Sequence, residues 1–163
     1  MNQPTETLER PVGASTRPAS ETARQWLGAF GDALAQGDAA GAARLFTKTS
    51  FWRDLVAFTW NLKTVENPDG VEDMLHETLD HVAPSNFQLS EEAEEADGIV
   101  TAWFTFETRI GRGEGLVRLK EGKAWTLLTA LYELKGHEEP MAESRPMGAV
   151  HGAGSDRKAW VER

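Results

Sequence analysis

Apolar residues recur at helical spacing in three segments of the chain's first half. Ser20 can cap a first helix that starts at Glu21, and Gly37 supplies the left-handed residue that ends it. The apolar face of this helix consists of Ala23, Trp26, Leu27, Phe30 and Leu34. Asp38 caps a short second helix that runs to about Phe46.

A third helix is predicted from about Val71 to Val82, after the turn Asn67-Pro68-Asp69-Gly70 and before Pro84. Its buried stripe consists of Val71, Met74, Leu75, Leu79 and Val82. His76 lies far from this stripe and is expected to face solvent. His81 lies on the flank of the stripe, where it faces either a cavity or water.

From Asn86 onward the pattern changes to strict alternation, which predicts strands joined by hairpins. Asp97-Gly98 is a strong hairpin signal, and glycines 111–115 and the segment 121–123 are read as the next two turns. The predicted strands are one through Phe87 and Leu89, a long one at 99–110, then 115–120 and 123–134.

The long strand has two faces of different polarity. The more apolar face is expected to pack on the helices and consists of Val100, Ala102, Phe104, Phe106 and Ile110. The opposite face carries Trp103 and Thr105, followed by Glu107 and Arg109, which are predicted to be solvated or paired across strands.

Helices first and an antiparallel sheet afterwards indicate the α+β class. The predicted architecture is a cone, in which a curved four-stranded antiparallel sheet wraps around three N-terminal helices and leaves one end open. Residues 1–19 read as a disordered leader, 20–135 as the cone domain and 136–163 as an extended arm or linker that ends near Trp160.

Composition excludes several function classes. The net charge is −9 and no segment clusters Lys or Arg, which argues against nucleic acid and anionic membrane surfaces as partners. No cysteine is present, and the four histidines lack metal-ligand spacing, so no metal site is expected. No signal peptide or membrane-spanning run is visible, which favours a cytoplasmic location.

Asp54 is the main candidate for chemistry, because the strand that starts near Ser50 carries it toward the space that the sheet would enclose. In an apolar cavity this carboxylate would act as a general base or acid, with His81 to orient it or relay a proton. The other reading is a cap or turn acid paired with Arg53 or the backbone. The pocket would be lined by Trp52, Phe58, Trp60, Phe104 and Tyr132.

The element order and the spacing of Gly37-Asp38, Leu45-Phe46 and the segment FWRD at 51–54 resemble the nuclear transport factor 2-like, or SnoaL-like, cone superfamily. That superfamily includes ketosteroid isomerases, polyketide cyclases, dehydratases, epoxide hydrolases and domains without chemistry. Aligned on the ketosteroid isomerases, Asp54 takes the position of the proton-shuttling aspartate. Phe30 takes the position of the oxyanion-binding tyrosine, and it has no donor, which argues against steroid isomerisation.

A narrower resemblance covers residues 20–163. The stretches WNLKTVENPDGVEDML, AWTLLTALYELKGHEEP and RPMGAVHG are similar to the domain that precedes the flavin module of a group of bacterial and fungal flavin-dependent monooxygenases. The chain carries no G-x-G-x-x-G after a strand, so no cofactor is expected in it, and FAD and NADPH would enter only with a following flavin module.

Two functional hypotheses follow from these observations. The first is an accessory module that binds an apolar small molecule or forms a homodimer through the outer sheet face, with Trp103 and Trp125 as anchors, beside a flavin module in the same or a neighbouring chain. The second is a stand-alone isomerase, cyclase, dehydratase or epoxide hydrolase that uses Asp54 as its base.

Overall fold

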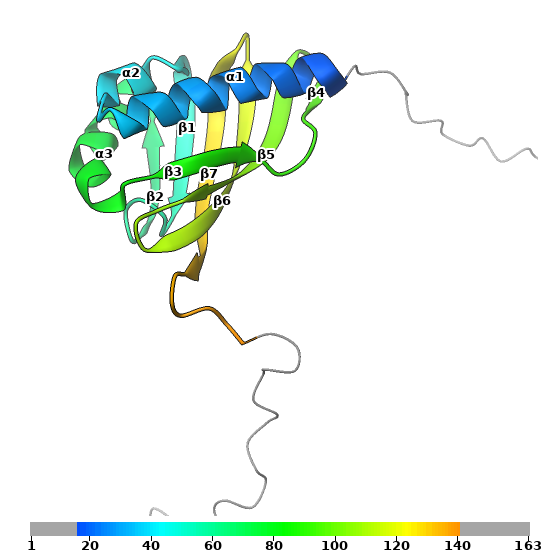
Figure 1. The fold of residues 1–163 in the computed structure, drawn as a ribbon. Coiled ribbons are helices and arrows are strands. Elements are labelled where there is room, and N and C mark those ends of the chain that lie inside the picture. The colour runs from blue at the N-terminus through cyan, green and yellow to red at the C-terminus, as the bar shows by residue number, and fades with distance from the viewer. Residues whose placement is uncertain (1–15, 141–163) are drawn as a thin grey trace, which may run out of the picture.

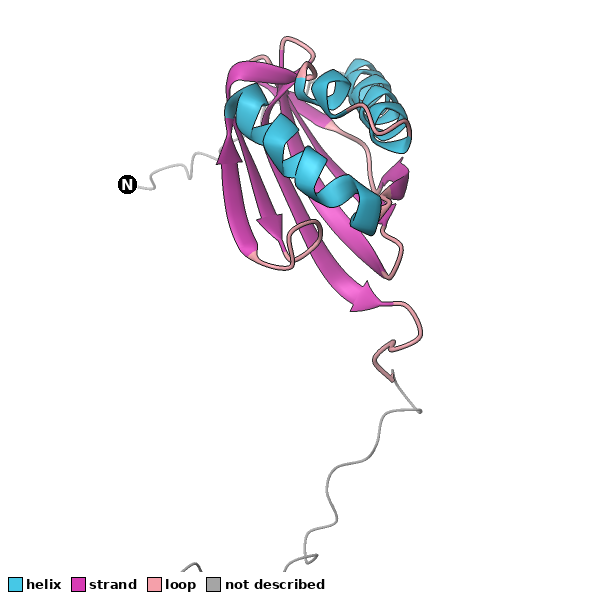
Figure 2. Ribbon diagram, turned by 90° about the vertical axis from the view of Figure 1, so that its left-hand side faces the viewer, coloured by secondary structure: helices cyan, strands magenta, loops and turns pink. Residues whose placement is uncertain are grey.

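The computed structural model describes residues 16–140, in which three helices lie on one face of a curved sheet (Figures 1 and 2). The helices are α1 (Thr16–Ala35), α2 (Ala39–Ala43) and α3 (Asn67–Val82). The strands are β1 (Phe46–Leu55), β2 (Leu62–Glu66), β3 (Ser85–Leu89), β4 (Glu94–Ala96), β5 (Ile99–Glu107), β6 (Gly111–Lys120) and β7 (Lys123–Leu134). The α+β class and the curved sheet around helices are therefore confirmed.

The sheet is larger than the predicted four-stranded meander, and it is mixed. Within the described residues it contains seven strands in the order β2-β1-β7-β6-β5-β3, with β4 paired to β5. β1 runs parallel to β7, whereas the other neighbours are antiparallel. The prediction missed this because the sequence pattern gave no partner for the strand that carries Asp54.

The first helix begins earlier than predicted. Thr16 is its first residue, so Ser20 lies inside the helix instead of capping it. The buried hydroxyl of Ser20 accepts a hydrogen bond of 2.9 Å from the backbone N–H of Ala93, which ties α1 to the segment before β4. The expected disordered leader is thus wrong for residues 16–19, and residues 1–15 lie outside the described part.

The third helix ends where predicted but starts at Asn67. Its C-terminal residue is followed by Ala83 in the left-handed conformation, with φ of 44°. Arg109 holds this end, because its guanidinium donates to the carbonyl of Asp80 at 2.7 Å and its backbone N–H donates to the carbonyl of Val82 at 2.8 Å. Arg109 therefore does not pair with Glu107, which instead contacts Lys135 at 2.6 Å.

The Asp97-Gly98 turn is confirmed, with positive φ at both residues, but it joins β4 to β5. The single strand predicted before it is divided into β3 and β4, and both pair with β5. β5 itself ends at Glu107, and Ile110 lies in the turn that follows it, 44% exposed, not on the inner face.

Gly111, Gly113 and Gly115 do not form a turn; they lie in β6, on its inner face. Gly115 is paired with Phe104 and Gly113 with Phe106 on β5. A Cβ on either glycine would overlap the aromatic ring of its partner, well inside van der Waals contact. The two aromatic rings therefore pack directly on the backbone of the glycines. This close approach requires residues without a side chain, which explains why glycine occurs inside a strand here.

Candidate functional site

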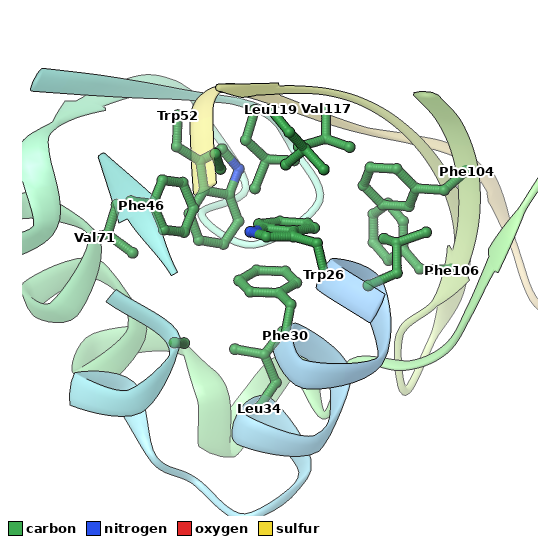
Figure 3. Packing of buried hydrophobic residues seen from close by; sticks show 14 of the residues in the cluster. Trp26, Phe30, Leu34, Phe46, Trp52, Val71, Phe104, Phe106, Val117 and Leu119 are labelled. Carbon is green, nitrogen blue, oxygen red and sulfur yellow. The ribbon is translucent and has the colours of Figure 1, made fainter. Parts of the chain in front are cut away.

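The interior between helices and sheet is filled by aromatic side chains (Figure 3). Phe30 from α1 packs against the rings of Trp26, Phe46 and Trp52 with centroid separations of 4.8–6.1 Å. Phe87 continues the cluster from Phe30 toward β5. Of the predicted pocket lining, Trp52, Phe58 and Phe104 are buried members of this core, at 2% exposure or less.

The two remaining residues of the predicted lining lie on the surface. Trp60 is 60% exposed in the connection between β1 and β2, and Tyr132 is 56% exposed. Tyr132 and Trp125 are the extra residues at two irregularities in the β6–β7 pairing, where Leu131 pairs with Gly113 and Glu133 with Arg112. Strict alternation counted from the buried Ala124 places Tyr132 on the inner face, but the extra residue Trp125 shifts the pattern and Tyr132 lies outward.

Asp54 is fully buried at the end of β1, and its carboxylate accepts four hydrogen bonds. Oδ2 accepts from the backbone N–H groups of Phe58 and Thr59 at 3.0 and 2.9 Å and from the Thr59 hydroxyl at 2.9 Å. Oδ1 accepts from the hydroxyl of Thr129 on β7 at 2.7 Å. The Thr129 hydroxyl in turn accepts from Nε1 of Trp52 at 2.9 Å.

This network fixes the connection between β1 and β2. The turn needs such support because Val56 and Trp60 have φ values of 57° and 54°, a region that residues with a Cβ adopt at a cost. Sequence reasoning placed the carboxylate at the correct strand end, but it missed Thr59 and Thr129 as partners. Burial together with four donors satisfies a carboxylate without a substrate.

His81 is not brought to Asp54. It is exposed in the last turn of α3, and the hydrogen bonds of Asp54 within the described residues go to Phe58, Thr59 and Thr129. His76 is also exposed, as predicted, 3.5 Å from Glu72. Among residues 16–140, no three His, Asp or Glu side chains gather in a way that would hold a metal ion.

A pocket of about 360 Å³ that the sequence did not indicate lies between α1 and β3. Its lining consists of Arg24, Leu27, Gly28, Phe87, Gln88 and Leu89. Gly28 has open space where a Cβ would stand, so the missing side chain helps to leave this hollow. The pocket lies on the outer side of the aromatic core and does not include Asp54.

Ion pairs gather at the end of the sheet where β7 finishes. Arg112 contacts Glu133 at 2.6 Å and Glu138 at 3.1 Å. The hydrogen bond from Lys135 lowers the pKa of Glu107. Backbone N–H groups of Glu138 and Gly136, and then Arg112, lower the pKa of Glu138 to about 2. These paired charges hold the first residues of the arm against the sheet.

The outer face of the sheet has the opposite character to the filled interior. Trp103, Leu116 and Leu128 lie next to one another in register across β5, β6 and β7. Trp103 is 39% exposed, and the two leucines are half-buried. We call these three residues the central row. The helices lie on the other side of the sheet, so the row has no cover within the described residues (Figure 2).

Solved structures share this architecture at low sequence identity. A cystatin-like domain of unknown function from Nostoc punctiforme is 14% identical over 70% of this chain and 78% of its own, with a TM-score of 0.58. An NTF2-like protein of unknown function from Pseudomonas putida is 14% identical over 72% and 89%, with a TM-score of 0.56. The fold is NTF2-like.

A ketosteroid isomerase-like protein from Erwinia carotovora is similar at 7% identity, with a TM-score of 0.58 over 70% of this chain and 96% of its own. At these identities the likeness concerns the NTF2-like fold and not its chemistry. No family model and no curated protein matches the sequence. No helix in the described part has both the length and the apolar character needed to cross a membrane.

Proposed function

We propose that this chain is an NTF2-like scaffold module that forms a homodimer through the outer face of its sheet. The observation that supports this function most strongly is the central row, where a tryptophan and two leucines lie side by side on three central strands and stay partly exposed. A tryptophan at the centre of an apolar patch is the residue type that dominates binding energy at protein interfaces.

The interior supports a scaffold more than a catalyst. Three of the five rings that were expected to line a cavity, those of Trp52, Phe58 and Phe104, are buried in the aromatic core. The Asp54 carboxylate is buried and accepts its hydrogen bonds from Phe58, Thr59 and Thr129. Asp54 as a general base stays a prediction. A substrate would reach it only after residues 56–61 had moved away and the hydrogen bonds from Phe58 and Thr59 had broken.

The dimer is tested by native mass spectrometry and analytical ultracentrifugation of the full chain and of two variants. Trp103→Lys places a charge in the centre of the proposed contact and is expected to raise the dimer dissociation constant at least about a hundredfold. Trp60→Lys is the matched control, because Trp60 is exposed but lies outside the central row, and its dimer should be unchanged. A wild-type chain that is only monomeric at micromolar concentration overturns the proposal.

The proposed partner beyond a second copy is a flavin-binding module, in the same or a neighbouring chain. Its support is the sequence resemblance of residues 60–75 and 124–140, while residues 145–152 and 160–163 lie outside the described part. Reading the coding DNA beyond codon 163, and the neighbouring genes, for a strand followed by G-x-G-x-x-G tests this association. If neither contains such a strand and motif, the proposal of a flavin-binding partner is wrong and the proposal of a homodimer is unaffected.

A further inference from the structure

On β6, the outer face carries opposite charges on the two sides of the central row. On β6, Arg118 lies two residues from Leu116 in one direction and Glu114 lies two residues away in the other. Both are exposed, and each is about 7 Å from the leucine along the strand. On β6, a basic residue therefore lies on one side of the row and an acidic residue on the other.

The registers extend this arrangement across the sheet. From β5 to β1 the arginine row consists of Thr101, Arg118, Thr126 and Phe51, and the registers continue it to Glu94 on β4 and Glu66 on β2. Over the same strands the glutamate row consists of Thr105, Glu114, Ala130 and Leu55, and the registers continue it to Gln88 on β3 and Leu62 on β2. The central row lies between them, so three parallel rows cross the strands.

We propose that the two copies pack with their two-fold axis along the central row, an inference that rests on the proposed homodimer. A two-fold axis of a face-to-face dimer lies in the plane of the interface. When it follows the central row, each of Trp103, Leu116 and Leu128 meets its own counterpart. Residues of the arginine row then meet the glutamate row of the other copy.

The pairs that this axis creates on β6 and β1 are complementary, and at the ends of the rows Glu94 and Glu66 face the uncharged Gln88 and Leu62. Arg118 faces Glu114 of the other copy, twice in each dimer, and Phe51 faces Leu55, which is also apolar. Packed sheets are about 10 Å apart, a gap that an arginine and a glutamate can span together. The small polar residues Thr101 and Thr105 face each other and add no repulsion.

The perpendicular axis, along β6, is unfavourable by the same reasoning. It would place Arg118 opposite Arg118 and Glu114 opposite Glu114, and like charges across an interface suppress the wrong arrangement. The apolar residues alone would allow both orientations of the two-fold axis. The charges on β6 favour the axis along the central row.

Arg53 marks where the contact ends. It continues the central row onto β1, where it would meet its own counterpart, but its guanidinium donates to the Thr64 hydroxyl on the edge strand β2 at 3.3 Å. The side chain is thus directed toward the edge of the sheet, and the contact is centred on β5, β6 and β7.

The test uses charge reversal on the full chain, measured by sedimentation equilibrium. Arg118→Glu and Glu114→Arg each create two like-charge contacts per dimer, and each is expected to weaken the homodimer at least about tenfold. Mixing the R118E chain with the E114R chain places opposite charges at both contacts. A heterodimer with an affinity within about threefold of wild type is the expected result, visible by native mass spectrometry because the two masses differ.

Controls separate this inference from the homodimer itself. Arg24→Glu changes the net charge as R118E does, but it lies exposed on α1 on the helix side of the sheet, and its dimer should be unchanged. Circular dichroism checks that the variants fold. If W103K dissociates the dimer while R118E and E114R have no effect, the axis is wrong and the homodimer stands. If the mixture forms no heterodimer, the Arg118–Glu114 contact is also wrong.

Discussion

The two faces of β5, β6 and β7 use apolar residues in different ways. On the inner face, Phe104 and Phe106 lie on Gly115 and Gly113, and both rings pack against Phe87 of β3, which contacts Phe30 of α1. On the outer face, Trp103, Leu116 and Leu128 have strand neighbours but no covering layer within the described residues. The inner face is thus covered within one chain, whereas the outer face is the one that we propose a second copy covers.

We therefore expect the inner face to govern the stability of the fold and the outer face to govern association. Substitutions on the inner face should therefore lower the free energy of unfolding. Substitutions of the exposed charges on the outer face should change the oligomeric state and leave the fold intact. Substitutions of the buried Asp54 and Gly115 test the first expectation, and the dimer experiments described above test the second.

The largest effect is expected at Asp54. Asp54→Ala leaves the donors of Phe58, Thr59 and Thr129 buried without an acceptor, which should lower the free energy of unfolding by roughly 3–5 kcal/mol. Asp54→Asn keeps one carbonyl oxygen toward Phe58 and Thr59 and should cost only about 1–2 kcal/mol. Urea unfolding of the three proteins measures both values.

Hydrogen exchange tests the same network from another side. The backbone amides of Phe58 and Thr59 should be protected in the wild-type protein and exchange much faster in the D54A variant. Rapid exchange of both amides in the wild type would show that the connection opens readily, and it would strengthen the acid-base hypothesis for Asp54.

The next effect concerns the glycines of β6 that contact the aromatic rings of β5. Gly115→Ala forces the Phe104 ring to move and should destabilise the protein by roughly 1–3 kcal/mol. Gly28→Ala is the matched control, because its Cβ would meet open space on helix α1 and alanine favours helix by up to about 1 kcal/mol. The midpoint of thermal unfolding should fall in Gly115→Ala and rise in Gly28→Ala. Equal decreases in both variants would show that the contact between Gly115 and Phe104 has no special role.

The smallest effect is a pH dependence at the start of the arm. The pKa of Glu138 is lowered from 4.5 to about 2 in the folded protein. Because the folded value is the lower one, the contribution of its hydrogen bonds is fully present above about pH 4.5 and is lost as the pH falls toward 2. NMR titration of the Gly136 amide should show a midpoint near pH 2, and Glu138→Gln should abolish it.

Sequence patterns predicted the helices and the inner face of β5 because each has a strong local period. The period of α1 gave its apolar face, and alternation gave Val100, Ala102, Phe104 and Phe106 as buried. The start of α1 was missed since serine is a common cap, whereas the Ser20 hydroxyl accepts here from the backbone N–H of Ala93, which is far away in the sequence.

The candidate site was less accessible to sequence reasoning because it depends on pairs far apart in the chain. Thr129 meets Asp54 only because β1 and β7 pair in parallel. Tyr132 was assigned to the inner face because a bulge shifts the alternation without any signal in composition. Glycines 111–115 were read as a turn because glycine is typical of turns, whereas here it makes room for rings from β5.

The contacts between aromatic rings and glycines restrict which substitutions can occur at these positions during evolution. A descendant that acquires a side chain at Gly115 has no room for it until Phe104 becomes smaller, and the same holds for Gly113 with Phe106. In distant relatives the two positions of each pair should therefore covary, with a small residue on one strand wherever its neighbour on the other strand is large.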